Sequence, residues 1–132
     1  MHIDKEHREF EPIALDRRWE TPPGYPPGIK QQILAGYLDE NNKRGYRTRH
    51  LRFEPGAHTT VPFVHDYWEE VYLISGDLIV GSDERGRGGT KFGPHTYACR
   101  PPGVFHGPFK SETGCLLLEI HLYSGDNAGA ER

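Results

Sequence analysis

The segment HDYWEEVYLISG, residues 65–76, places a histidine and an acidic pair directly before a run that is typical of a β-strand. Val, Tyr, Leu and Ile at 71–74 favour a strand, because β-branched and aromatic side chains pack well on a pleated surface. His65 and Glu69 are four residues apart, which on one straight strand corresponds to roughly 13 Å, too far for two ligands of one metal ion. We therefore expect His65 at the end of one strand and Glu69 at the start of the next, with a tight turn between them.

A second segment, PPGVFH at residues 101–106, supplies a turn and a further histidine. With His65 and Glu69, His106 would complete a set of two imidazoles and one carboxylate, donors that suit zinc, iron, manganese or nickel. Glu70 is the alternative carboxylate, but strand alternation sends Glu69 and Glu70 to opposite faces. The candidate metal ligands are therefore His65, Glu69 and His106.

The rest of the chain favours an all-β fold. The 132 residues include 16 Gly, 11 Pro and a single Met, a composition that suits many short connections. The near-continuous apolar run at 116–118 predicts a last strand that is buried on both faces. We expect about seven to nine short strands in a sandwich or barrel, among them residues 31–38, 46–53, 71–74, 78–80, 96–100 and 115–123.

The expected organisation is one domain with two extensions. Residues 1–30 form an N-terminal arm, residues 31–123 the barrel, and residues 124–132 a flexible tail. The proline-rich stretch at 21–28 cannot join a helix or a central strand. The chain length is that of a single core.

Charge and hydropathy exclude several classes of partner. The formal net charge of −3 gives no general attraction to nucleic acid or an anionic membrane. No apolar run is long enough to span a bilayer, and the first ten residues are charged where a signal peptide is apolar. We therefore expect a cytoplasmic protein with a small-molecule substrate, in which Cys99 and Cys115 are free thiols.

At the two metal-ligand segments the sequence resembles the cupin superfamily, whose motifs are G-x5-H-x-H-x3,4-E-x6-G and G-x5-P-x-G-x2-H-x3-N. The first is matched by His65, Glu69 and Gly76, and the second contains a matching Pro, Gly and His, namely Pro101, Gly103 and His106. The resemblance implies a cupin barrel (a double-stranded β-helix, or jelly roll) that holds one divalent metal ion.

Phe63 is the main departure from these motifs, because it stands where the first motif has its first histidine. Gly56 and Gly93 are also displaced from the motif spacing, and Lys110 replaces the usual Asn. Two histidines and one carboxylate with open positions are the ligand set of non-haem Fe(II) oxygenases, so Fe(II) is favoured, while zinc, manganese and nickel remain alternatives.

Four residues are candidates for binding a substrate. Aromatic side chains near the ligands would wall an apolar pocket, and Arg52 would bind an anion if its strand face is the barrel interior; the set is Arg52, Phe63, Trp68 and Phe105. Three other histidines are weaker ligand candidates: His58 lies at a strand entrance, His95 in a loop, and His121 reads as a packed strand residue. No catalytic residue is assigned.

The resemblance extends to small single-domain cupins that include acetylacetone-cleaving dioxygenases, and to the metal-binding cupin domain of ChrR-type anti-sigma factors. It implies an Fe(II) dioxygenase acting on a small diketone or phenolic ketone. The alternatives are a non-catalytic metal-binding sensor, or a metal-assisted isomerase or hydrolase on a sugar-like acid with Arg52 as its carboxylate clamp. The resemblance to single-domain cupins also implies a homodimer. We expect the arm at 21–28 to pair the two copies.

Overall fold

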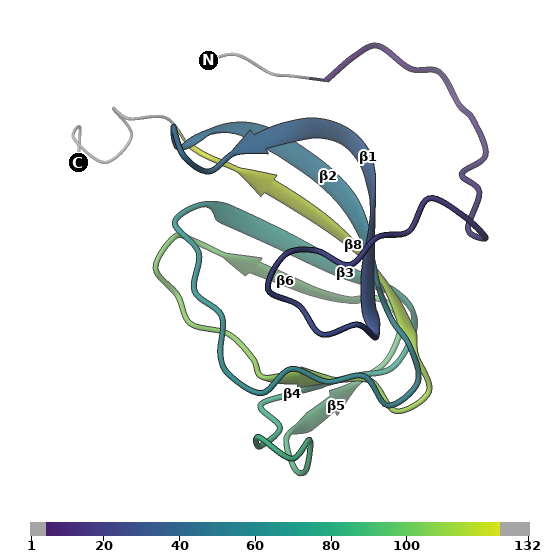
Figure 1. The fold of residues 1–132 in the computed structure, drawn as a ribbon, viewed down its shortest axis with the longest axis vertical. Coiled ribbons are helices and arrows are strands. Elements are labelled where there is room, and N and C mark those ends of the chain that lie inside the picture. The colour runs from purple at the N-terminus through teal and green to yellow at the C-terminus, as the bar shows by residue number, and fades with distance from the viewer. Residues whose placement is uncertain (1–4, 125–132) are drawn as a thin grey trace.

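The computed structural model describes residues 5–124, which form two antiparallel sheets and, in this range, no helix. The larger sheet has the strand order β1-β2-β8-β3-β6 and the smaller one β5-β4-β7 (Figure 1). The strands are β1 (Ile29–Asp39), β2 (Arg44–Phe53), β3 (Trp68–Gly76), β4 (Leu78–Val80), β5 (Thr90–Phe92), β6 (Thr96–Arg100), β7 (Phe109–Lys110) and β8 (Cys115–Leu122). The prediction of an all-β chain is confirmed, and no helix within residues 5–124 could cross a membrane.

The predicted strands are present, and three of them, β1, β2 and β3, are longer than expected. Strand β3 begins at Trp68 and therefore includes Glu69, three residues earlier than the apolar run alone indicated. Strands β5 and β7 were not among the predicted segments, because they are too short to show a period and, unlike the three apolar residues of β4, mix apolar and polar residues.

The expectation that β8 is buried on both faces is wrong. Its side chains alternate strictly: Cys115, Leu117, Glu119 and His121 are buried, whereas the residues between them are only half-buried. The inward face thus ends in two polar residues, and the leucines at 116 and 118 lie on the outer face of the sheet.

The apolar core is formed by inward-facing residues of the larger sheet together with Leu78 of the smaller one. Its members are Ile29, Leu51, Phe53, Val71, Leu73, Leu78, Cys115 and Leu117. A smaller apolar cluster is formed by Leu38, Tyr67 and Tyr123. Between these clusters the inward positions of β2, β8 and β3 change from apolar to charged, so a polar layer crosses the barrel interior.

Gly76 ends β3 and allows the next strand pairing. Its φ is +85°, and a Cβ atom at this position would lie 2.0 Å from the carbonyl oxygen of Gly114. This close approach occurs where the end of β3 pairs with the start of β8. Only glycine combines this backbone angle with so close an approach. Gly76, the last residue of the first motif, is therefore required by the backbone conformation at this point of the fold.

The N-terminal arm packs on its own barrel, which corrects the expectation that residues 21–28 are free to pair two copies. Glu20 forms a β-bridge with Gln31, Pro22 is buried, and the ring of Tyr25 stacks on Phe63 at 5.0 Å. Residue 124 ends the described range, so the flexible tail predicted at 124–132 lies almost wholly outside the described residues.

Candidate metal centre

A row of four inward-facing side chains crosses the larger sheet at one level. Arg47 on β2 is paired with His121 on β8, His121 with Glu69 on β3, and Glu69 with Arg100 on β6. Directly opposite residues of antiparallel strands have side chains close enough to interact. The register of four strands therefore assembles a charged row from positions far apart in the sequence.

Glu69 is held by both of its carboxylate oxygens. Arg100 donates from Nη1 to Oε1 at 3.0 Å, and the Nε2 atom of His121 lies 2.9 Å from Oε2. The Glu69 side chain is buried, so these bonds fix its carboxylate in a low-dielectric setting. A carboxylate has about four lone-pair sites, and each oxygen keeps capacity for a further ligand.

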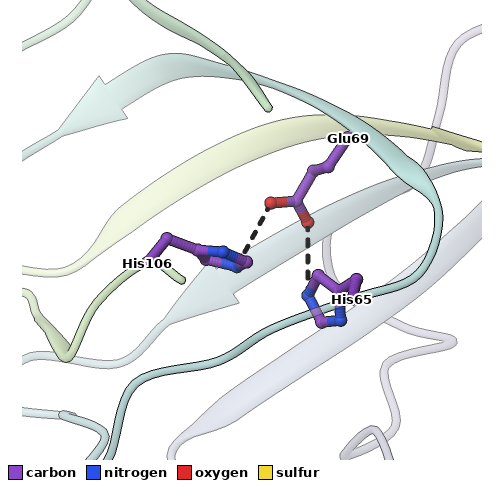
Figure 2. A group of neighbouring side chains, drawn as sticks. All are labelled: His65, Glu69 and His106. Atoms are coloured by element: carbon purple, nitrogen blue, oxygen red, sulfur yellow. Dashed lines mark ion pairs between the residues drawn. The ribbon is translucent and has the colours of Figure 1, made fainter. Parts of the chain in front are cut away.

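His65 and His106 approach the same carboxylate from two loops. Figure 2 shows both rings turned towards Glu69, with His65 Nε2 3.9 Å from Oε2 and His106 Nε2 3.4 Å from Oε1. The loops are joined by backbone bonds: Phe63 and His106 exchange two hydrogen bonds of 2.7 and 2.9 Å, and Gly103 N donates to the carbonyl of His65 at 2.8 Å. The bend at 66–67 then leads from His65 into β3, as the spacing argument requires.

The three donors fit a metal ion. One ligand atom from each of His65, Glu69 and His106 can be chosen so that all lie within 4.8 Å of one another. The Nε2 atom of His65 is buried and has no hydrogen-bond partner in residues 5–124, and such an orphaned atom costs free energy unless something binds it. Burial lowers the pKa of His65 to about 4 and also lowers the pKa of His106, so both rings are neutral at pH 7 with a lone pair to offer.

His121 positions Glu69 and does not act as a fourth donor. Arg47 donates from Nε to Nδ1 of His121 at 3.1 Å, so Nδ1 accepts and the ring proton lies on Nε2. That proton is directed at Glu69, which leaves no free lone pair on the ring. The cluster of Glu69, Glu119 and His121, whose donor atoms also lie close together, is thus a hydrogen-bonded network.

A second row, next to the first, neutralises itself. Arg49 and Glu119 are directly paired, and the guanidinium of Arg49 lies 2.8 Å from the Glu119 carboxylate and also donates to Gln31 at 2.8 Å. Burial alone would raise the pKa of Glu119, but the charge of Arg49 keeps it far below its usual range. The two charges of the pair balance, and Glu119 lines the cavity beside the candidate ligands.

A cavity of about 30 Å³ lies beside Glu69 and His106. This is room for about two water molecules. Its polar wall includes Arg100 and Tyr25, and the remaining wall is mostly apolar, with Phe63 and Phe109 over the histidine side. The space beside the ligands is therefore small and mostly apolar, and its charged lining is Arg100 together with Glu69 and Glu119.

The predicted substrate-binding residues are not brought together. Phe63 lines the cavity, with its ring centre 6.1 Å from those of both His65 and His106. Arg52 instead stacks on Trp19 at 4.2 Å on the outer face, and Trp68 and Phe105 are 36% and 69% exposed. The expectation that these three residues line the pocket is wrong. Strand alternation directs Arg52 on β2 and Trp68 on β3 outward, and the loop at 103–106 leaves Phe105 exposed.

The other residues that the sequence left open are also placed. Glu69 faces inward, whereas Glu70 faces outward and accepts a hydrogen bond from Tyr97. His58 and His95 do not join the ligands: His58 bridges Lys110, and His95 contacts the Tyr72 hydroxyl. Both thiols are free, as predicted.

Sequence reasoning missed Arg47 and Arg100. It correctly took His121 as a packed strand residue rather than a ligand, but it did not foresee that His121 bonds Glu69. The leucines and isoleucine around His121 indicated a packed strand, but an alternating strand places odd and even residues on opposite faces. Counting in steps of two from the buried Cys115 would have placed Glu119 and His121 inward. Nothing in the sequence indicated that Arg100 lies opposite Glu69.

Comparison with known proteins gives likenesses of structure alone: no family model matches the sequence, and no curated protein does either. A cupin from Shewanella frigidimarina described as RmlC-like matches with a TM-score of 0.63 and 22% identity over 95% of this chain and 97% of that one. KdgF from Halomonas sp. matches with a TM-score of 0.61 and 20% identity, over 88% of this chain and 94% of that one. An acetylacetone dioxygenase from Acinetobacter johnsonii matches with a TM-score of 0.60 and 20% identity, over 94% and 84% of the two chains.

These likenesses span almost the whole chain and agree with its two antiparallel sheets. Identities near 20% carry the fold and leave the chemistry of each protein its own. The chain is a cupin by fold, a jelly-roll barrel with His65, Glu69 and His106 gathered inside it.

Proposed function

We propose that the protein is a metal-dependent cupin enzyme, in which His65, Glu69 and His106 hold one divalent ion. The observation that carries this proposal is the buried, unpartnered Nε2 of His65 beside Glu69 and His106. A bound divalent ion supplies Lewis-acid polarisation of a substrate oxygen. The ligand set favours Fe(II), and it also suits zinc, manganese or nickel.

The reaction that we propose is dioxygen-dependent cleavage of a small diketone or phenolic ketone. Two features support it: the two-histidine, one-carboxylate set is typical of Fe(II) oxygenases, and one structural neighbour is an acetylacetone dioxygenase. Phe63 offers no lone pair, so it leaves a coordination position to substrate and keeps that side of the cavity apolar. Arg100 and His121 hold Glu69 in place while this position is filled.

Metal content tests the ligand assignment. Protein purified without added metal should contain about one equivalent of divalent ion, and His106→Ala should lose stable binding, because a three-donor site cannot spare a donor. His95→Ala is the matched control, since His95 is exposed and lies outside the site. Full metal occupancy in His106→Ala would refute the assignment.

Oxygen uptake tests the reaction. Fe(II)-loaded protein should consume oxygen with small 1,3-diketones or phenolic ketones, and the His106→Ala variant should not. If the protein binds metal but takes up no oxygen with any of these compounds, the proposed dioxygenase activity is excluded. The site would then be that of a non-catalytic metal-binding module.

A further inference from the structure

The charges around the candidate metal site do not balance. Arg49 is neutralised by Glu119, at 2.8 Å. The row above contains two arginines, Arg47 and Arg100, against the single carboxylate of Glu69. None of the carboxylates in residues 5–124 forms an ion pair with Arg47, whose nearest polar partner is His121. The polar layer, in which Arg47 is half-buried, therefore carries an excess positive charge even before a metal ion is added.

A metal ion would deepen this imbalance. Glu69 carries one negative charge, and Arg100 already uses it through a 3.0 Å ion pair. If Glu69 also ligates a divalent ion, three positive charges remain in excess across the two rows. Buried charge without a partner is costly, so the site gains stability from any anion that can enter it.

Arg100 is placed to meet such an anion. Its side chain is 17% exposed, lines the cavity beside Glu69 and His106, and lies with its guanidinium 5.8 Å from the ring centre of Phe109. Within the described part of the chain, only one nitrogen of the Arg100 side chain, Nη1, donates a hydrogen bond, and its acceptor is Glu69. A guanidinium has five N–H donors in a planar fork that matches a carboxylate or another oxyanion, so donors remain for a ligand.

We propose that the cavity binds its substrate as a small oxyanion, the carboxylate of an oxo acid or the enolate of a 1,3-diketone, with Arg100 as its counter-charge. This proposal rests on the proposed metal site and names the substrate class for it. The volume of about 30 Å³ has room for the oxyanion group and for little more of the ligand. The apolar part of the wall lowers the local dielectric constant and strengthens the attraction between Arg100 and the anion.

Binding to zinc-loaded protein tests the proposal without requiring turnover. The probes are pyruvate and pyruvamide, which have nearly the same shape and differ in charge. By calorimetry, wild type should bind pyruvate at least tenfold more tightly than pyruvamide. Arg100→Gln should abolish that preference, while Arg100→Lys should keep part of it, because lysine retains the charge and loses the fork. Arg52→Gln, on the outer face, is the matched control and should bind as wild type does.

A second probe separates the two sources of the oxyanion. Wild type should shift the absorption of 2,4-pentanedione towards that of its enolate at neutral pH, and Arg100→Gln should not. A shift without pyruvate binding identifies the enolate, and the reverse identifies the carboxylate.

Elemental analysis of every variant separates this proposal from the metal assignment. Failure of wild type to retain zinc counts against the proposed metal site, and the same titrations are then made on metal-free protein, where Arg100 should still favour pyruvate. Equal affinity for pyruvate and pyruvamide in wild type together with no shift of the 2,4-pentanedione absorption would overturn the role of Arg100, and so would an unchanged response to all three probes in zinc-retaining Arg100→Gln.

Discussion

Phe63 occupies a ligand position of the first motif without being able to act as a ligand. Its ring stacks on that of Tyr25 at 5.0 Å, and its centre lies 6.1 Å from the ring centres of both His65 and His106. The backbone bridge between Phe63 and His106 would remain if the side chain were changed. An imidazole at position 63 would therefore enter the site on an unchanged backbone.

We predict that Phe63→His binds zinc at least tenfold more tightly than wild type, as measured by competition with a chromophoric chelator. The added donor raises the ligand count from three to four, and a tenfold gain corresponds to about 1.4 kcal/mol. If the protein is an oxygenase, turnover should fall at the same time, because the fourth donor fills the position left for substrate.

Val64→His is the control for this change. Val64 is next in sequence but 47% exposed, so an imidazole there is directed away from the ligands. Equal zinc affinity in the two variants would contradict the alignment of the first motif with residues 63–76.

At the scale of an element, Asp77 links the turn after β3 to the loop that precedes β8. Its carboxylate accepts hydrogen bonds from the backbone nitrogens of Glu112 and Thr113, at 2.9 and 2.8 Å, and from the hydroxyls of Ser111 and Thr113. Asp77 is 6% exposed. These bonds hold β8 in the register that places Glu119 and His121 in the polar layer.

We predict that Asp77→Ala lowers the free energy of unfolding by roughly 2–4 kcal/mol, measured by urea denaturation, because it leaves several buried donors unpaired. Glu112→Ala should change it by about 0.5 kcal/mol or less, since the Glu112 side chain is half exposed and forms only a surface pair with Lys91. A loss for Asp77→Ala no larger than that for Glu112→Ala would contradict the assigned role.

The same carboxylate makes stability depend on acid. Burial opposes its ionisation, but the hydrogen bonds from Thr113 and Glu112 outweigh this and lower the pKa of Asp77 from 3.8 to about 2. The unfolded chain therefore binds a proton before the folded one does, and the contribution of Asp77 is lost as pH falls from about 4 to about 2. In this window the stability of Asp77→Ala should decline less steeply than that of wild type.

At the scale of the whole molecule, one half of the larger sheet has an uncovered outer face. The N-terminal arm covers the β1–β2 half, where Trp19 packs against His50 and Arg52. On β3 and β6 the outward rings of Trp68, Tyr72 and Tyr97 are 36%, 39% and 56% exposed. Tyr72 lies opposite both Tyr97 and Leu118, so the exposed rings adjoin the half-buried outer leucines of β8.

The homodimer expected from the sequence remains a prediction, and this face is where we now place it. A second copy related by a two-fold axis would present the same apolar strands to each other and cover both. Light scattering at micromolar concentration should give the mass of a dimer. Tyr72→Lys should shift it towards the monomer mass, whereas Phe92→Lys should not, since Phe92 is equally exposed but lies on the smaller sheet. A monomer mass for wild type would refute the prediction.

The sequence by itself determined the strand-rich fold, the two motif segments and the three candidate ligands. These are local properties: a turn between His65 and Glu69, a Pro-Pro-Gly turn before His106, and a glycine at 76 that no other residue replaces. Periodicity and turn chemistry are carried by neighbouring residues, so they can be read without knowing how the strands pair.

Only the tertiary structure decided what surrounds the ligands. Arg47, His121, Glu69 and Arg100 form one row because four strands distant in sequence meet in a particular register. That register depends on irregularities such as the one between Leu73 and Ser75 in β3. A shift of one residue would send each side chain to the other face. The sequence pointed to Arg52 as the anion ligand, whereas strand pairing placed Arg52 on the outer face and Arg100 beside the candidate metal site.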